Sequence, residues 1–335
     1  MTTALLSVLL PARNAQATLE EALESMALQT FGDFHLVAVD DGSTDATGAI
    51  LDEWARRDRR VEVVRGPGLG IVAALNEGLK RCHGAFVARM DADDVALPRR
   101  FEDQLAMLED QPELAAVGGQ VEIFPREEMA PGLRAYEAWI NSLTSARTVL
   151  RECFVESPLV HPAAMIRSSA LREAGGWRDD GWAEDYALWL ELLARGLPLA
   201  NVPQVLLRWR DRPERLTRTH QAYEARSLLR LKARYLARMR VKSGRCIVWG
   251  AGKTGRALMR ALAAEAVRVE LFVDIDPAKV GRRLHGVPVV SPEQLSGYGG
   301  THLIAAVGAR GARALIREHL ERKGWVEIEQ FTCVG

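Results

Sequence analysis

The 335-residue sequence carries no net charge, because 44 lysine and arginine residues balance 44 aspartate and glutamate residues. A neutral chain has no global field that would favour nucleic acid, so we expect no nucleic-acid partner. Long apolar runs are absent too, since none approaches the roughly 18 residues of a membrane span. The apolar residues 4–10 follow no basic segment, which favours a buried first strand over a secretion signal.

Cysteine is scarce, and its four positions form no close pair: Cys82, Cys153, Cys246 and Cys333. This spacing excludes the usual zinc sites and disulfide frameworks and fits a reducing compartment. We therefore expect a cytoplasmic protein, and one that can work at the inner face of the membrane. No Ser-His-Asp or Cys-His arrangement is evident, so no covalent nucleophile is expected. The length suggests two domains.

Short apolar runs alternate with helix-forming segments over the first hundred residues. The runs read as strands at residues 5–10, 34–39, 61–64 and 86–90. Helical patterns separate them, and Ser43 or Thr44 could cap the helix after the second strand. This alternation predicts an α/β fold with a doubly wound, mostly parallel sheet.

Two of these strands end in acid clusters. The fourth strand runs into Asp91, Asp93 and Asp94, and the second into Asp40 and Asp41. Acids at the carboxyl ends of neighbouring strands line the crevice where open α/β sheets bind ligands. Grouped carboxylates repel unless a cation or protonation relieves them, and their oxygens suit Mg²⁺ or Mn²⁺. The alternatives are polar turns, one of them before a helix that begins near Pro98.

Four segments resemble, in letters, order and spacing, the motifs of glycosyltransferase family 2. The resemblance covers about residues 4–215 and implies an inverting nucleotide-sugar transferase of the GT-A fold. The segments are 9–14 (Leu-Leu-Pro-Ala-Arg-Asn), 39–45 (Val-Asp-Asp-Gly-Ser-Thr-Asp), 75–78 (Leu-Asn-Glu-Gly) and 88–94 (Ala-Arg-Met-Asp-Ala-Asp-Asp).

The resemblance assigns roles to the donor side. Asp93, with Asp91, would hold Mg²⁺ or Mn²⁺, and Asp94 would be an extra acid beside them. Arg89 would lie near the diphosphate, although a surface charge on a strand edge is the alternative. The residues implied in binding the nucleotide sugar are Pro11, Arg13, Asn14, Asp40, Asp41, Asn76, Arg89, Asp91 and Arg208.

The acceptor side is expected at the start of a helix over residues 183–195. Glu184 and Asp185 occupy its first turn, where the helix dipole favours carboxylates. Ordinary helix-end chemistry explains them equally well, but they match the family's Glu-Asp pair, which makes Asp185 the catalytic base with Glu184 beside it. His161 matches a further family feature and has a structural alternative. The Gln-x-x-Arg-Trp pattern of processive synthases is absent.

The segment 208–245 is strongly basic, in contrast with the neutral whole. A helix is expected over residues 223–239. Its surface is either a solvated connecting helix or a face for anionic lipid headgroups, so peripheral membrane contact is a possible partner interaction.

A second nucleotide-binding pattern begins at residue 245. Gly250, Gly252 and Gly255 form G-x-G-x-x-G between an expected strand and helix, and Asp274 follows where an acid can bind ribose hydroxyls. This region resembles the small Rossmann-like domains that precede sugar acyltransferase modules, and implies a nucleotide or dinucleotide ligand. The alternative is a packing module without a ligand. The expected domains are 1–215, a basic helical linker 216–243, and 244–335.

These patterns together predict a metal-dependent inverting glycosyltransferase. It would move a sugar from a nucleoside diphosphate sugar, most simply a UDP sugar, to a hydroxyl of a glycan, lipid-linked or small-molecule acceptor in surface-glycan or polysaccharide assembly. An NAD(P)-linked oxidoreductase or nucleotide sensor, based on the second glycine loop, is one alternative. A non-catalytic scaffold for glycan assembly is another.

Overall fold

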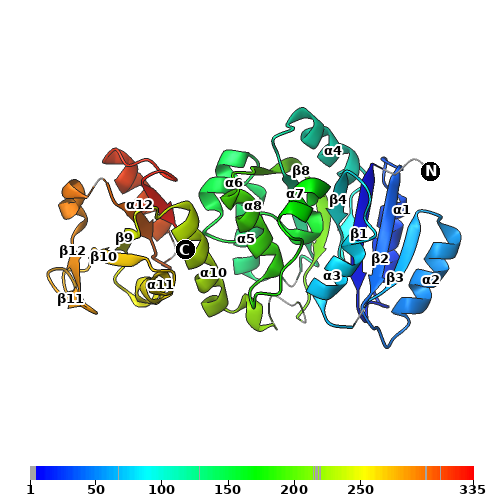
Figure 1. Ribbon diagram of the computed structural model, residues 1–335, viewed down its shortest axis with the longest axis horizontal. Coiled ribbons are helices and arrows are strands. Elements are labelled where there is room, and N and C mark those ends of the chain that lie inside the picture. The colour runs from blue at the N-terminus through cyan, green and yellow to red at the C-terminus, as the bar shows by residue number, and fades with distance from the viewer. Residues whose placement is uncertain are drawn as a thin grey trace. The chain divides into compact units, whose positions relative to one another are not determined.

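The computed structural model describes residues 5–66, 68–127, 129–213, 215, 218, 220–298, 300–309 and 311–335 (Figure 1). Residues 216, 217 and 219 of the expected linker therefore lie outside the described residues. The chain divides into two compact units. The first comprises Met1–Val149, Pro158–Asp180 and Glu184–Arg218, and the second comprises Leu150–Ser157, Gly181–Ala183 and Thr219–Gly335.

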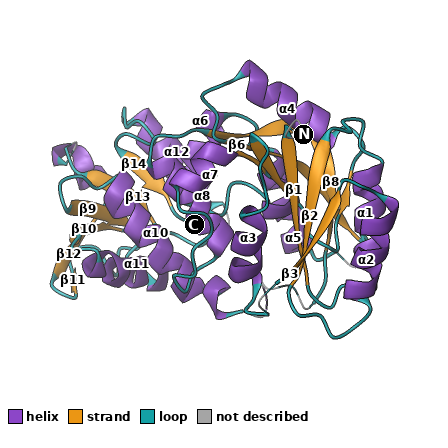
Figure 2. Cartoon of the chain, turned by 45° about the vertical axis from the view of Figure 1, so that its right-hand side comes forward, coloured by secondary structure: helices purple, strands orange, loops and turns teal. Residues whose placement is uncertain are grey.

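The first unit is built on an eight-stranded sheet with the order β3-β2-β1-β4-β7-β6-β8-β5. Figure 2 shows β1, β2 and β3 side by side in this sheet. Its first four strands are parallel to one another, and β7 and β5 pair antiparallel with their neighbours. All seven residues of β1 are buried, as expected for a parallel strand covered on both faces. The strands are β1 (Leu6–Ala12), β2 (Phe34–Asp40), β3 (Val61–Arg65), β4 (Phe86–Arg89), β5 (Val95–Ala96), β6 (Ala116–Phe124), β7 (Met165–Arg167) and β8 (Leu199–Arg210).

Helices connect these strands and cover the sheet with their apolar faces. In α8, for example, Tyr186, Trp189 and Leu190 are buried, as the sequence pattern predicts. The helices are α1 (Leu19–Ala27), α2 (Thr47–Arg57), α3 (Ile71–Leu79), α4 (Arg100–Asp110), α5 (Pro131–Asn141), α6 (Ala146–Glu152), α7 (Ser168–Glu173) and α8 (Glu184–Ala194), with a 3₁₀ turn at His161–Ala163. The last turn of α6 belongs to the second unit.

The second unit has a six-stranded sheet with the order β11-β12-β10-β9-β13-β14. Five of its strands are parallel and only β11 is antiparallel, which gives the Rossmann-like half-fold that the glycine loop predicts. The elements are α10 (Ala225–Met239), β9 (Arg245–Trp249), α11 (Lys253–Ala264), β10 (Arg268–Val273), β11 (Arg283–Leu284), β12 (Val287–Val290), β13 (His302–Ala305), α12 (Ala312–Arg322) and β14 (Phe331–Cys333).

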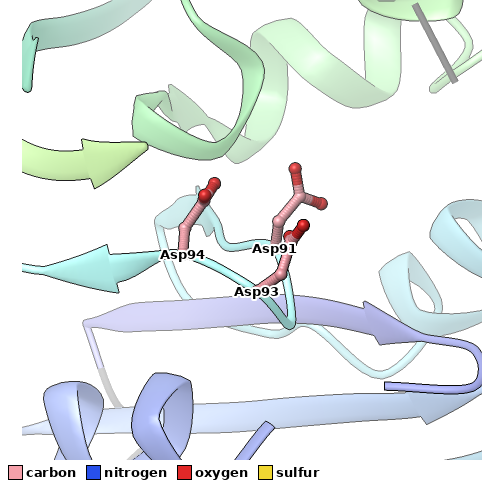
Figure 3. A group of neighbouring side chains, drawn as sticks. All are labelled: Asp91, Asp93 and Asp94. Carbon is pink, nitrogen blue, oxygen red and sulfur yellow. The ribbon is translucent and has the colours of Figure 1, made fainter. Parts of the chain in front are cut away.

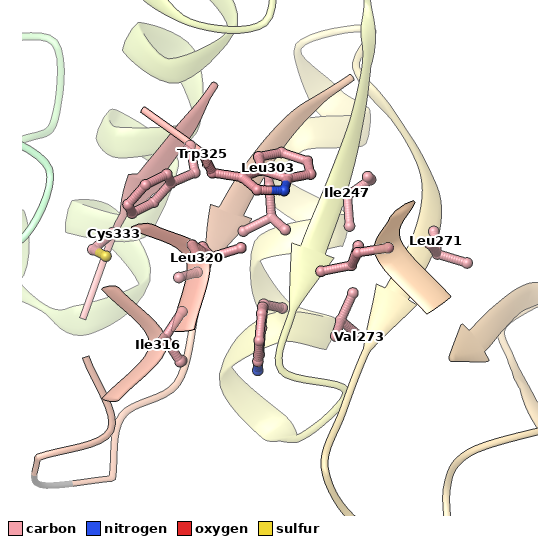
Figure 4. Close-up of a cluster of buried hydrophobic side chains, with 12 residues drawn as sticks. Ile247, Leu271, Val273, Leu303, Ile316, Leu320, Trp325 and Cys333 are labelled. Carbon is pink, nitrogen blue, oxygen red and sulfur yellow. The ribbon is translucent and has the colours of Figure 1, made fainter. Parts of the chain in front are cut away.

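Apolar side chains from the strands and from α12 form the core of the second unit (Figure 4). Ile247, Leu303, Leu320 and Trp325 are among them, and Val155 packs against the same cluster. Val155 comes from Leu150–Ser157, the segment that interrupts the sequence of the first unit. The core of the second unit is therefore completed by residues that lie far from it along the chain.

An ion network binds the same segment to α12. Arg317 places Nη2 2.7 Å from Oε1 of Glu152 in an ion pair and donates from the same nitrogen to Oε1 of Glu327 at 2.8 Å. Burial raises the pKa of Glu327, although Arg317 opposes this rise. Breaking a buried ion pair is costly because it leaves a charge without compensation. The network therefore makes Leu150–Ser157 an integral part of the second unit.

The expected α/β class, with a mostly parallel sheet and a second Rossmann-like sheet, is confirmed, but several local predictions differ from the structure. The cap prediction is wrong, because α2 begins at Thr47 with Ala46 before it, and Ser43 Oγ accepts the N–H of Asn14. The strand β8 is twelve residues long, although the sequence at its carboxyl-terminal half has an apolar run only at residues 205–207. Its polar residues and two register irregularities against β6 break the apolar run that sequence reasoning needs.

Candidate functional site

The sheet order brings the two acid clusters to one edge. Strands β2 and β4 both pair parallel with β1, one on each side, so all three carboxyl ends face the same way. Asp40 ends β2, and the loop from Asp91 to Asp94 follows β4. The shared edge that the sequence predicts is thus present in the structure.

Asp91, Asp93 and Asp94 form a compact carboxylate cluster, which we call the acid triad. One oxygen from each lies within 4.8 Å of the others. Figure 3 shows the three side chains rising from one short loop toward the same side. Asp94 is buried, whereas Asp91 and Asp93 are half-buried. Three oxygens at this spacing form a donor set for a hard divalent cation.

The electrostatics of the acid triad are unfavourable without a cation. Burial raises the pKa of Asp93, and the negative charge of Asp91 adds to the rise. Burial raises the pKa of Asp94 well above its ordinary value, with Asp91 and Asp93 contributing. Oδ2 of Asp94 is buried and accepts no hydrogen bond from any residue that the structure describes. A buried carboxylate oxygen of this kind needs a proton or a metal ion.

Two arginines at the carboxyl end of β8 contact the acid triad. Arg212 donates from Nη2 to Oδ2 of Asp93 at 2.5 Å. The backbone N–H of Arg210 donates to Oδ1 of Asp94 at 2.8 Å, and its Nε donates to the carbonyl of Asp93 at 2.7 Å. Sequence reasoning selected Arg208, whose guanidinium carbon lies 4.4 Å from the centre of the Phe124 ring, as does that of Arg210. No local signal separates Arg210 from Arg208, since residues two positions apart lie on the same face of a strand.

Two further arginines lie beneath the acid triad. Arg89 is buried and donates from Nη2 to Oδ1 of Asp91 at 2.6 Å, so the alternative of a surface charge is wrong. Arg100 is also buried and donates from Nη2 to the carbonyl of Arg89 at 2.6 Å. Burial lowers the pKa of Arg100 to about 9, against the opposing effect of Asp94. Sequence reasoning missed Arg100, since an arginine in a first helical turn usually faces solvent.

The predicted nucleotide residues from β1 and β2 hold the loops at the sheet edge. Pro11 lies in β1, and the exposed Arg13 places Nη1 3.7 Å from Oδ2 of Asp41. Asn14 adopts a φ of 49°, and its side-chain oxygen accepts the N–H of Thr44 at 2.9 Å. These three side chains begin at the carboxyl end of β1, between the two acid clusters.

Asp40 and Asp41 are buried, and each fixes a neighbouring loop. Asp41 accepts the backbone N–H groups of Gly68 at 2.8 Å and of Gly70 at 2.9 Å. Asp40 accepts the N–H of Ser43 at 3.0 Å and pairs with Arg65 at 2.9 Å. The glycine loop before α3 is therefore held to the end of β2 by a carboxylate.

Asn76 bonds to a different part of the first unit. Its Nδ2 donates to the carbonyl of Trp177 at 2.7 Å, and its Oδ1 accepts the N–H of Trp177 at 3.1 Å. Both ends of the amide are therefore used to join α3 to the loop before α8. Gly176 allows the approach, since a Cβ there would lie 2.5 Å from Oδ1 of Asn76.

The start of α8 carries the two acids of the expected acceptor side. Asp185 accepts the N–H of Tyr186 at 2.7 Å, and Glu184 is buried with Oε1 3.8 Å from Nδ1 of His161. Trp177 donates from Nε1 to Nε2 of His161 at 3.0 Å. An indole N–H can only donate, so Nε2 is the acceptor and Nδ1 carries the proton.

His161 is neutral in this environment. Burial lowers its pKa well below the ordinary value, and Arg89 adds to the effect. Its neutral N–H faces Glu184, and its ring lies against Trp177 and Trp189, with centroids 5.8 Å and 6.0 Å away. His161 thus orients Glu184 and the N-terminus of α8 from within the core.

In the second unit, the glycine loop has the predicted geometry. Gly250 has a φ of 117°, and a Cβ at Gly255 would lie 1.8 Å from the carbonyl oxygen of Gly250. At Gly252, directly before α11, a Cβ would meet no heavy atom within 4 Å. The first and third glycines thus permit close packing, and the second leaves open space at the helix N-terminus.

Asp274 ends β10 and supports the same loop. Its Oδ2 accepts the N–H of Ala251 at 2.9 Å and lies 3.1 Å from Nζ of Lys279, and its Oδ1 accepts the N–H of Asp276 at 2.9 Å. Burial raises the pKa of Asp274, but these three hydrogen bonds outweigh it and the pKa is lowered. Asp274 is therefore an ionised acid that fixes the glycine loop.

No helix among the described residues is both long and apolar enough to cross a membrane. Among curated proteins, the chain is 34% identical over 193 residues to the amylovoran biosynthesis glycosyltransferase AmsE of Erwinia amylovora, covering 57% of this chain and 70% of that protein. It is 31% identical over 190 residues to the UDP-Gal:alpha-D-GlcNAc-diphosphoundecaprenol beta-1,3-galactosyltransferase of Escherichia coli, covering 56% and 67%.

Solved structures share the fold. TarS 1-349 of S. aureus in complex with UDP superposes with a TM-score of 0.55 at 19% identity, covering 77% of this chain and 70% of that one. The mannosyltransferase PcManGT of Pyrobaculum calidifontis, in complex with GDP-Man and Mn²⁺, gives a TM-score of 0.51 at 19% identity, covering 79% and 70%. Both likenesses confirm the fold class that the sequence predicts.

Two family models match the chain. The model described as CoA binding domain matches residues 241–329, in agreement with the Rossmann-like sheet of the second unit. The model described as Glycosyl transferase family 2 matches residues 7–175, which include the acid triad, Asp41 and His161. Because this match covers half of the chain and carries its acidic sheet edge, the protein belongs to glycosyl transferase family 2 and is a glycosyltransferase.

Proposed function

We propose that this glycosyltransferase moves a sugar from a nucleoside diphosphate sugar to a hydroxyl acceptor in a single, metal-dependent, inverting displacement. The observation that carries the proposal is the buried, unpartnered Oδ2 of Asp94 inside the acid triad. A diphosphate brings two negative charges to this edge, and only a cation makes its approach to three carboxylates favourable.

The donor set of the acid triad fits Mg²⁺ or Mn²⁺. Asp93 and Asp91 would supply the ligand oxygens, and Asp94 would support them from within the fold. When bound, the ion would neutralise the charge that develops on the departing nucleoside diphosphate. Mn²⁺ is present in the mannosyltransferase complex of similar fold, which supports this choice of cation.

The donor would lie along the edge formed by β1, β2 and β4. Arg13 is 53% exposed beside Asp41 and can contact the nucleotide, and Asn14 and Asp40 fix the loops around it. Arg89 and Arg208 add positive charge for the phosphates. UDP is the nucleotide we propose, since the names of the Escherichia coli relative and of the S. aureus complex both include it.

Asp185 is the base in this proposal. It would accept the proton of the acceptor hydroxyl while that oxygen attacks the anomeric carbon and the bond to the diphosphate breaks. A carboxylate is a weak base for an alcohol, so proton transfer must accompany attack and depends on positioning. Asp185 lies in the first turn of α8, where the helix dipole favours a carboxylate, and Glu184 of the same turn lies 3.8 Å from His161. One displacement inverts the anomeric centre.

The acceptor we propose is a lipid-linked or other intermediate of surface-glycan assembly. Two relatives support this class, one named for amylovoran biosynthesis and one for a diphosphoundecaprenol acceptor. Such an acceptor lies at a membrane surface, so peripheral contact through the basic segment 208–245 is part of the proposal.

The test is a panel of nucleotide sugars screened for binding and transfer with and without a divalent cation. The cognate donor should raise the melting temperature only with Mn²⁺ or Mg²⁺ present, by several degrees at a hundredfold excess over Kd. Asp93→Asn should abolish both this shift and transfer. The matched control Asp110→Asn removes one exposed acid from the end of α4 and should change neither. Full transfer in a strong chelator would overturn the proposal, and so would retention of configuration.

We also propose that the region 244–335 binds a nucleotide-containing ligand and regulates or positions the enzyme. The open space at Gly252, before the N-terminus of α11, favours this second role, because helix N-termini attract phosphates. Titrating the full-length protein with coenzyme A, NADH and UDP sugars would identify the ligand class. Hydride transfer with NADH would favour the oxidoreductase alternative, and absence of binding by all three would favour a packing module.

A further inference from the structure

The helix α10 has an unusual charge composition for a surface helix. Its fifteen residues, Ala225–Met239, include five basic residues and no acidic residue. Surface helices ordinarily mix charges of both signs, because opposite charges three or four positions apart stabilise the helix. The basic excess on α10 therefore calls for a partner outside the helix.

The structure separates the basic residues of this region into two sets. Lys232 is buried and donates from Nζ to the carbonyl of Val155 at 2.8 Å, and burial lowers its pKa. Arg240 donates from Nη2 to the carbonyl of Leu150 at 3.2 Å. These two residues hold the second unit together and are not available to a ligand.

The other set is exposed and regularly spaced. Arg226, Arg230 and Arg234 follow one another at intervals of four residues, so they form a row along one side of α10. Arg238 is the next residue at this spacing, but its guanidinium carbon lies 5.7 Å from the centre of the Tyr235 ring, so we leave it out of the row. None of the three has an ion pair with a carboxylate among the described residues. Like charges at this spacing destabilise a helix. The row thus carries a repulsion that an anionic surface would relieve.

Trp182 contacts two members of this row. The guanidinium carbons of Arg230 and Arg234 are 6.0 Å and 5.6 Å from the centre of its ring. Its indole N–H is buried and finds no acceptor among the residues described. The ring thus groups two guanidinium ions on one patch, and an aromatic side chain flanked by arginines suits the boundary between water and lipid.

We propose that Arg226, Arg230 and Arg234, with Trp182 among them, form a docking surface for an anionic phospholipid bilayer. Charge complementarity carries the inference, since phosphate headgroups supply the negative charges that the helix lacks. The inference narrows the membrane contact of the proposed function from the whole basic segment 208–245 to one helix face. Arg208, Arg210 and Arg212 fall outside it, because they stack on Phe124 or bind the acid triad.

The place of Trp182 in the chain gives this surface a use. The chain runs from Trp182 through Ala183 to Glu184 and Asp185, the start of α8. A bilayer that fixes Trp182 would therefore restrict the segment that leads directly to the proposed base. An acceptor embedded in that bilayer would be recruited by the same contact.

Sedimentation of the full-length protein with vesicles tests the proposal. Vesicles of phosphatidylcholine with 30% phosphatidylglycerol should bind the protein, and vesicles of phosphatidylcholine alone should not. This fraction of phosphatidylglycerol gives the vesicle surface a roughly physiological negative charge. Binding should fall steeply with added salt. The triple variant Arg226→Gln, Arg230→Gln, Arg234→Gln should lose on the order of 100-fold in partitioning, at about fivefold for each arginine.

The matched control is the triple variant Arg260→Gln, Arg268→Gln, Arg282→Gln. It removes the same charge from three other exposed positions of the second unit and should bind vesicles as the parent protein does. Equal loss in both triple variants would overturn the proposal, as would vesicle binding that survives in the α10 variant. The proposal would also be overturned if the full-length protein bound duplex DNA more tightly than anionic vesicles. The assay contains no nucleotide sugar, so its outcome is independent of the transfer reaction.

Discussion

Arg212 holds Asp93 through a 2.5 Å contact between Nη2 and Oδ2, at the carboxylate oxygen that a divalent cation would need. Asp93 is 18% exposed and Arg212 is 40% exposed in this pair. An arginine side chain of that exposure can move away at modest cost. Under the proposed function, donor binding would exchange cations at Asp93: the guanidinium of Arg212 would leave and become available to the diphosphate.

The first prediction concerns this exchange. Arg212→Gln should tighten Mn²⁺ binding in the absence of nucleotide, because the metal no longer competes with the guanidinium. An ion pair of this exposure is worth up to about 1 kcal/mol, so the gain should be at most about fivefold. Electron paramagnetic resonance of free Mn²⁺ measures it. Arg208→Gln is the control, since it removes an arginine from β8 without touching Asp93. Unchanged or weaker Mn²⁺ binding would contradict the prediction.

The second prediction tests the base. Asp185→Asn keeps the size of the side chain but cannot accept a proton, so the transfer rate should fall by about 10²- to 10⁴-fold. Binding of the nucleotide sugar should be retained, as measured by titration calorimetry. Asp179→Asn removes an exposed acid from the preceding loop and serves as the control. Equal rates for Asp185→Asn and Asp179→Asn would show that another group takes the proton.

The third prediction compares two glycines of one loop. Gly255→Ala would place a Cβ 1.8 Å from the carbonyl oxygen of Gly250, so it should destabilise the second unit by about 3 kcal/mol or more. Gly252→Ala meets no atom within 4 Å and has an ordinary φ of −82°, so stability should change by less than about 1 kcal/mol. Calorimetric unfolding separates the two. Loss of ligand binding in Gly252→Ala, with stability intact, would locate the second ligand at this helix end.

The fourth prediction concerns pH. Burial lowers the pKa of His302 to about 4, against the opposing effect of the Glu329 carbonyl and with help from Arg240. The folded state then binds fewer protons than the unfolded state between pH 6.5 and about 4, so stability is lost as pH falls through this window. The full loss of stability is ~3 kcal/mol, because the pKa is lowered by about 2.5 and each pKa unit corresponds to about 1.36 kcal/mol.

His302→Gln should reduce the pH dependence of unfolding in that window. Glutamine can keep a hydrogen bond to Thr332, which lies 3.0 Å from Nε2 of His302, but it does not titrate. Denaturant unfolding of the second unit at pH 7 and pH 5 provides the measurement. The exposed His83→Gln is the control. If His302→Gln loses as much stability on acidification as the parent protein, the burial of the imidazole is not the cause.

The elements that the sequence predicts well depend on local patterns. The apolar strand before Asp91 and the glycine loop around Gly252 are both recognisable from a few consecutive residues. The structure confirms both, as β4 and as the loop before α11. The roles of the residues at the sheet edge remain predictions. Asn76 illustrates the difficulty, because its motif indicates the nucleotide while its amide bonds the backbone of Trp177. A contact over such a long sequence separation has no local signature.

The residues that sequence reasoning missed share a physical cause. Arg212 and Arg100 read as ordinary surface charges, and only the fold brings them to the acid triad. Lys232 belongs to the basic segment 208–245, yet its side chain is buried, whereas those of Arg230 and Arg234 are exposed. Helical periodicity shows which residues share one face of a helix. It does not show which face is buried until the element that packs against the helix is known.

The ion network of Arg317 has a consequence for anyone who would divide this protein. Glu152, one of its two carboxylate partners, comes from a stretch located nearly a hundred residues before Arg245 in the sequence. A protein that started at Arg245 would keep the half-buried guanidinium of Arg317 with only one of its two carboxylate partners, and it would lack Val155, which packs against the core. Domain shuffling by a single crossover would therefore fail here. Transfer of the Rossmann-like part to another protein would have to include Leu150–Ser157 as well.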